Sequence, residues 1–160
     1  MEATVVKADY LNNRHEEHIQ VLLNSYASDP MGGGIPLEEE VRRNVVKELS
    51  KLPHAFSVIA YLDGVPVGLA NCFEAFSTFS CKPIVNIHDI VVLKEFRGNG
   101  ISHKLLEKIE EIARSRSCCK LTLEVLSRNE VAKISYEKFG FSGYELDPKL
   151  GKALFWQKKL

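Results

Sequence analysis

Apolar side chains along the chain follow two periods, one typical of helices and one typical of strands. Four segments carry apolar residues every three or four positions, which predicts amphipathic helices with core faces at Ile19–Tyr26, Val41–Leu52, Ile101–Ile112 and Val131–Phe139. Runs rich in β-branched and aromatic residues predict strands at residues 3–9, 55–62, 65–76, 83–93 and 120–126, with further strands near 141–145 and 153–160. The predicted order mixes hairpin and crossover connections, as an α/β domain does.

Turn and cap residues support these boundaries. Asp63-Gly64 separates two strand-like runs and is a strong signal for a two-residue hairpin. The glycine and proline density of residues 28–36 predicts a loop. Capping-box pairs are expected to open two of the helices: Asn13 with Glu16, and Ser127 with Glu130.

Length and charge narrow the class of protein. A chain of 160 residues fits one compact domain, so residues 1–160 are predicted to form a single domain. Its 21 basic and 21 acidic side chains cancel, which argues against a nucleic-acid or membrane partner. The N-terminus does not resemble a leader, and apolar runs fall short of the roughly 18 residues that span a bilayer. We therefore expect a cytoplasmic protein.

The four cysteines are predicted to be free thiols. Cys72, Cys81, Cys118 and Cys119 lack the C-x-x-C spacing of a zinc site, and the adjacent pair does not bridge without strain. A cytoplasmic location also disfavours disulfides. No metal site is expected.

The segment "FRGNGISH", residues 96–103, lies between a predicted strand and a predicted helix. Two glycines there fit a simple surface turn. They also fit a phosphate loop, because glycine permits close approach and a helix start offers free N–H groups to an anion. The segment matches neither the dinucleotide fingerprint nor the P-loop signature. From this loop alone, both a surface turn and a phosphate loop remain open.

A second motif follows about 30 residues downstream. Arg97 to Ile101 match a [QR]-x-x-G-x-[GA] pattern with Ser102 in its last position, and "EVLSRNEVAKISYEKFGF" carries Asn129, Ala132, Tyr136 and Gly140-Phe141 at matching spacing. Together the two motifs resemble the GNAT superfamily of acetyl-CoA-dependent N-acetyltransferases. The resemblance implies a mixed, mostly antiparallel sheet of about six to seven strands. That sheet splays between two central parallel strands and is flanked by about four helices.

The resemblance also implies a cofactor site for acetyl-CoA. The strand end at Ile90, Val91 and Val92 would pair with the pantetheine arm. The loop and helix start would give amides to the pyrophosphate: Arg97, Gly98, Asn99, Gly100, Ile101, Ser102 and His103. Asn129 matches a residue that contacts the cofactor arm, although an Asn near a helix start is also a common cap.

Acetyl transfer to an amine needs a base for the amine and an acid for the leaving thiolate. Tyr136 matches the position of the family's usual acid and could equally be an aromatic on a buried helix face. The base is left open among Glu124, His88, Asp89 and ordered water. Each of these side chains could instead be structural.

The acceptor remains unspecified by the sequence. Glu74, Phe76 and Phe79 would suit a pocket for a small amine with an apolar portion, or simply a packed hairpin. We expect direct transfer of acetyl from acetyl-CoA to a primary amine in a ternary complex, with a small amine favoured over a protein amine. The protein would be a monomer or homodimer. The alternatives are a CoA-binding sensor or complex subunit without turnover, and an enzyme that transfers a longer acyl group.

Overall fold

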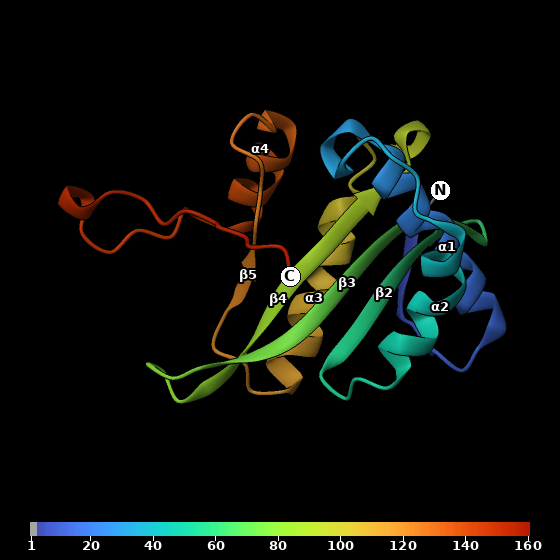
Figure 1. Cartoon of the computed structure of the whole chain (residues 1–160), viewed down its shortest axis with the longest axis horizontal. Coiled ribbons are helices and arrows are strands. Elements are labelled where there is room, and N and C mark those ends of the chain that lie inside the picture. Colours follow the sequence, from blue (N-terminus) through green and yellow to red (C-terminus); the bar gives the residue numbers. More distant parts are fainter. Residues whose placement is uncertain (1–2) are drawn as a thin grey trace. The chain divides into compact units, whose positions relative to one another are not determined.

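A computed structural model describes residues 3–160 of the chain (Figure 1). Its contacts divide the chain into two compact units, one ending at Leu123 and the other running from Glu124 to Leu160. The first unit holds a sheet and three helices, and the second holds one helix and an irregular segment. Each unit is described by itself.

The sheet of the first unit has five strands in the order β1-β2-β3-β4-β5. They are β1 (Ala3–Lys7), β2 (Ala55–Leu62), β3 (Val65–Ser77), β4 (Lys82–Val92) and β5 (Leu121–Leu123). The first four pair antiparallel, and β4 pairs parallel with β5. The β2–β3 turn is the predicted hairpin, because both Asp63 and Gly64 take positive φ values, 49° and 80°.

The expectation of six to seven strands is wrong. Residues 141–145 and 153–160 are not strands, and β5 occupies an edge of the sheet. A strand forms where the edge of a neighbouring strand accepts its backbone hydrogen bonds. A local pattern of apolar residues does not show whether such an edge is present. Here β5 itself is three residues long and offers a short edge, while Phe155 and Trp156 stay exposed.

Four helices match the predicted number: α1 (Asn13–Ser28), α2 (Glu39–Ser50), α3 (Ile101–Ser115) and α4 (Glu130–Phe139). The caps of α1 and α4 differ from the predicted ones. Asn12 Oδ1, not Asn13, accepts from the backbone of Arg14 and His15. Asn129 rather than Ser127 caps α4, since its side chain accepts from the Ala132 N–H at 3.2 Å.

The core lies on both faces of the sheet. One face packs on α3, whose predicted stripe is buried: Ile101, Leu105, Leu106, Ile109 and Ile112. Gly68 of β3 permits this approach, because a Cβ there would lie 3.2 Å from Ile101 and Leu105. The helices α1 and α2 pack on the other face (Figure 1), where Ile59, Leu69 and Val91 form one cluster with Ile19, Leu22 and Val46. No helix within residues 3–160 is long and apolar enough to cross a bilayer.

Candidate active site

The loop after β4 takes a conformation that glycine makes possible. Gly98 and Gly100 have φ values of 82° and 72°, in the left-handed region that other residues rarely adopt. A Cβ at either position would meet no atom within 4 Å, so the backbone here faces open space. A ligand could therefore approach the loop backbone closely.

Gly100 is also the N-cap of α3, and it has no side chain with which to cap the helix. By contrast, Asn12 and Asn129 give side-chain oxygens to the first turns of α1 and α4. The first-turn amides of a helix need an acceptor, and they carry the positive end of its dipole. The predicted residues Ile101, Ser102 and His103 form this first turn of α3.

Side chains anchor the loop to its surroundings. Arg97 donates from Nε to the Val92 carbonyl at 3.0 Å and from its guanidinium to Asp29 Oδ2 at 2.7 Å. The bond from Arg97 lowers the pKa of Asp29, which follows α1. Asn99 closes the turn through a bond to the Phe96 carbonyl at 3.1 Å. Arg97 thus ties the glycine loop to the loop between α1 and α2.

A histidine and a lysine beside the glycine loop also have protein partners. His103 lies 3.5 Å from Glu107, and Lys104 donates to the Ala3 carbonyl at 3.1 Å. The Lys104 contact places a positive charge near the start of α3.

The strand before this loop has one edge without a partner in the first unit. Ile90, Val91 and Val92 pair with Ala70, Leu69 and Gly68 of β3. On the other side, pairing with β5 ends at Ile87 and Leu123. The C-terminal half of β4 therefore presents a strand edge to which an extended ligand arm could add.

A β-bulge separates the two halves of β4. Asn71 of β3 lies opposite Asp89, while the next residue, Cys72, lies opposite Ile87, so His88 is the extra residue. The His88 ring meets Phe73 edge-on, with centroids 5.6 Å apart, and Asp89 Oδ2 accepts from Asn71 Nδ2 at 3.0 Å. Since Asn71 and Phe73 lie two residues apart on one strand, the bulge brings His88 and Asp89 to the same face.

A series of hydrogen bonds connects Asp89 to residues that the sequence did not single out. Ser57 donates to Asn71 Oδ1 at 2.7 Å, and the Tyr10 hydroxyl lies 2.8 Å from Ser57 Oγ. Burial, followed by the charges of Asp89 and Asp29, raises the pKa of Tyr26 on α1. The one sequence signal for this group was Asn71, a polar residue inside the apolar run "GLANCF".

The residues predicted for the acceptor pocket do not come together at Asp89. Glu74 pairs with Arg116 at 3.2 Å, and the Arg116 guanidinium lies over the Phe56 ring, 4.7 Å from its centroid. Phe76 near the end of β3 is exposed, and Phe79 beyond it is 99% exposed. These contacts give Glu74 a structural partner, and its role in acceptor binding stays a prediction.

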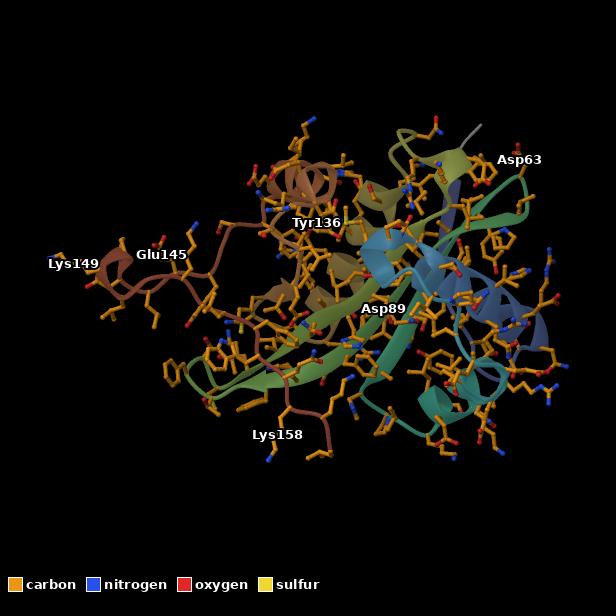
Figure 2. All side chains as sticks on the ribbon, turned by 45° about the horizontal axis from the view of Figure 1, so that its top comes forward. Asp63, Asp89, Tyr136, Glu145, Lys149 and Lys158 are labelled. Atoms are coloured by element: carbon orange, nitrogen blue, oxygen red, sulfur yellow. The ribbon has the colours of Figure 1, made fainter. Side chains whose placement is uncertain are left out.

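The second unit carries Glu124, Asn129 and Tyr136. Glu124 is exposed and lies outside β5, and Asn129 serves as the cap of α4. Tyr136 projects from α4 (Figure 2), and its ring meets Phe141 edge-on with centroids 5.9 Å apart. Gly140 ends the helix in the left-handed conformation, as the motif predicted.

No group of three or more His, Cys, Asp or Glu side chains in the described part of the chain could hold a metal ion. The predicted free thiols are confirmed for Cys72, Cys81, Cys118 and Cys119. Burial is the main cause that raises the pKa of Cys72, so this thiol keeps its proton.

Comparison with known proteins gives a consistent result. The model of the acetyltransferase (GNAT) family matches residues 19–141. A thialysine N-epsilon-acetyltransferase of Bos taurus is 35% identical over 74 residues, which are 46% of this chain and 43% of that protein. The chain spans less than half the length of this relative.

Two further matches cover more of the chain. An aminoglycoside N(6')-acetyltransferase type 1 of Salmonella typhimurium is 22% identical over 116 residues, 71% of this chain and 76% of that protein. The solved structure of AAC(6')-Iy in complex with the bisubstrate analog CoA-S-monomethyl-acetylneamine superposes with a TM-score of 0.77 at 20% identity. That match covers 100% of both chains and shows a shared fold. The chain therefore belongs to the GNAT family of acetyltransferases.

Proposed function

We propose that this protein transfers an acetyl group from acetyl-CoA to a primary amine by direct attack in a ternary complex. One observation carries the proposal: the strand that carries Asp89 leads, through one short 3-10 turn at Lys94–Phe96, into the glycine loop that opens α3. The start of α3, which suits an anion, and the Asp89 carboxylate thus lie on one continuous segment that runs from β4 into α3.

The residues of this segment fit the groups of CoA. The first-turn amides of α3 and the open backbone at Gly98 and Gly100 suit a pyrophosphate. The edge of β4 at Ile90 to Val92 suits an extended arm that bonds through its amides. Arg97 would act by holding the loop in place, because its guanidinium is already bound to Asp29.

The chemistry needs a deprotonated amine. We assign this step to Asp89, whose carboxylate would take one proton from the acceptor ammonium. The amine then attacks the thioester carbonyl, so a C–N bond forms and the C–S bond breaks. In this assignment the leaving thiolate receives a proton from the Tyr136 phenol, and the second proton that the nitrogen loses on becoming an amide returns to the Tyr136 phenolate. His88, which lies on the same face as Asp89, and Glu124 remain alternative bases.

A small amine is the favoured acceptor. The two curated relatives described above are named for thialysine and for aminoglycosides, which are small amines. The ring of Phe73, two residues from Asn71 on β3, meets the rings of His54 and of His88, the neighbour of Asp89, with centroids 6.2 and 5.6 Å away. Such a surface offers an apolar contact next to the carboxylate.

Purified protein with acetyl-CoA and a panel of aminoglycosides, lysine-like amines and peptides tests the proposal. Release of CoA thiol that depends on one of the amines, together with its N-acetyl product, is expected. Absence of both thiol release and CoA binding by calorimetry would overturn the proposal. CoA binding without release for any amine would instead support a sensor or complex subunit.

A further inference from the structure

A line of four polar side chains crosses the sheet and ends on Asp89. Ser57 of β2 lies opposite Asn71 of β3, and Asn71 lies opposite Asp89 of β4. Their side chains bond in that order, at 2.7 Å and 3.0 Å. Tyr10, from the segment between β1 and α1, extends the line through a 2.8 Å contact with Ser57.

Hydrogen-bond chemistry gives this line one direction. An ionised carboxylate can only accept, so Asn71 must turn its amide N–H toward Asp89 and its Oδ1 toward Ser57. Ser57 then donates its one hydroxyl proton to Asn71, so the Tyr10 hydroxyl must be the donor in its bond with Ser57. Burial raises the pKa of Tyr10, and its phenol therefore keeps the proton that it donates. Every bond in the line donates toward Asp89.

The location of the line argues against a purely structural role. Ser57 is 0% exposed and Asn71 is 3% exposed, and they are the buried polar residues among residues 3–160. Their neighbours on this face, Ile59, Leu69 and Val91, are apolar and buried. Apolar side chains of similar shape would pack there with little or no loss of stability, because buried polar groups bring a desolvation cost. Polar residues at these two sites are better explained by what they do to Asp89.

We propose that Asn71, Ser57 and Tyr10 are positioning residues that orient the Asp89 carboxylate for proton transfer from the acceptor amine. This inference rests on the proposed function. Asn71 holds Oδ2, and Oδ1 of Asp89 has no hydrogen-bond partner within the described residues. That oxygen is the atom offered to the amine.

Graded substitutions along the line test this role. We expect Asn71→Ala to lower kcat by about 10- to 100-fold, because misplacing a catalytic group by about 1 Å can cost that much. Ser57→Ala should cost less, and Tyr10→Phe should cost least, since each lies one bond further from Asp89. CoA affinity should stay at the wild-type value in all three variants.

Tyr61→Phe is the matched control. Tyr61 packs against the same core cluster as Tyr10, and its hydroxyl is bound to His18 Nδ1 at the same 2.8 Å, outside the line. Both substitutions remove one bonded phenol, so they should lower the melting temperature by similar amounts. Only Tyr10→Phe should lower kcat. Equal kcat for these two variants, with no loss in Asn71→Ala, would overturn the inference.

Double variants separate positioning from loss of structure. In an Asp89→Asn background the line has no carboxylate to orient, so adding Asn71→Ala should cause no further loss of kcat. Where turnover of that background is below detection, Asp89→Glu replaces it and the Asn71→Ala effect should shrink. An equal Asn71→Ala loss in both the wild-type and the altered background would reject the role. A wild-type protein without turnover or CoA binding would reject the proposed function itself, which is a distinct outcome.

Discussion

The two units of the chain hold their candidate site residues in different ways. In the first unit, Asp89 is bound by Asn71 on a sheet whose two faces are covered by buried side chains. In the second unit, α4 has no buried residue, and the Tyr136 ring has Phe141 beside it. The Asp89 carboxylate is therefore bound by a residue 18 positions away in the sequence, while the ring contact between Tyr136 and Phe141 joins residues five positions apart.

Core truncation should show the largest difference between the units. Leu105 is 0% exposed under the sheet, so Leu105→Ala should lower the free energy of unfolding by about 2–5 kcal/mol. Val131→Ala in α4 is the control, because Val131 is 82% exposed and its loss should change stability by less than about 0.5 kcal/mol. Urea unfolding measures both. Equal losses would contradict the contrast in burial.

Removal of the Tyr136 hydroxyl should affect activity without affecting the fold. Tyr136→Phe is expected to lower kcat by roughly 10²-fold or more, because the leaving thiolate loses its proton donor. CoA affinity should not change. Tyr144→Phe, at an exposed tyrosine of the same unit, is the control and should keep wild-type kcat. If Tyr136→Phe retained full kcat, Tyr136 would not be the acid.

The contrast also explains what the sequence could predict. The stripe of α3, the Asp63-Gly64 hairpin, the Gly140 cap and the glycine loop all depend on residues close together in the chain, and all are present. The bulge at His88 and the line from Tyr10 to Asp89 depend on strand register and on contacts between residues that are 14 to 47 positions apart. A lone Asn in an apolar strand is a hint of such a network, but it does not name the partner.

The predicted C-terminal strands failed for a related reason. Residues 153–160 begin with an apolar run that includes Phe155 and Trp156, and aromatic residues favour a strand locally. In the structure Phe155 and Trp156 are exposed, and residues 153–160 form no strand. The local preference of these residues for a strand says nothing of which sheet edge would accept their backbone hydrogen bonds.

The glycine loop offers a sharper test of the first unit. Gly100→Val should weaken CoA binding about tenfold or more, because a branched side chain enters the space that the pyrophosphate needs. Gly64→Val is the matched control: Gly64 also has a positive φ, 80° against 72°, and also faces open space. Both variants carry backbone strain of about 1–3 kcal/mol, so stability should fall in both. Calorimetry that shows equal loss of CoA affinity would contradict the loop assignment.

The smallest expected effect concerns the ion pair between Asp29 and Arg97. The bond from Arg97 lowers the pKa of Asp29 in the folded state below its ordinary value of 3.8, so the pair stabilises the fold above that pH. The stabilisation is lost as pH falls through the lower, folded-state value. Because the Arg97 side chain is 49% exposed, Asp29→Asn should cost no more than about 1 kcal/mol at neutral pH.

Urea unfolding of wild type and Asp29→Asn at pH 7 and at about pH 3 measures this effect. The difference between the two proteins should shrink at the acid pH. Glu39, whose exposed side chain pairs with Arg43 of α2, gives the control variant Glu39→Gln, away from the glycine loop. If the difference in unfolding free energy between wild type and Asp29→Asn grew at acid pH, the direction of the Asp29 pKa shift would be contradicted.

Initial rates with acetyl-CoA and the best amine of the panel, both varied, test the central claim most directly. Direct transfer in a ternary complex predicts intersecting double-reciprocal lines and no acetylated protein when the amine is left out. Parallel lines with an acetyl group on the protein would show a covalent intermediate and contradict the account. So would a complete absence of amine-dependent thiol release.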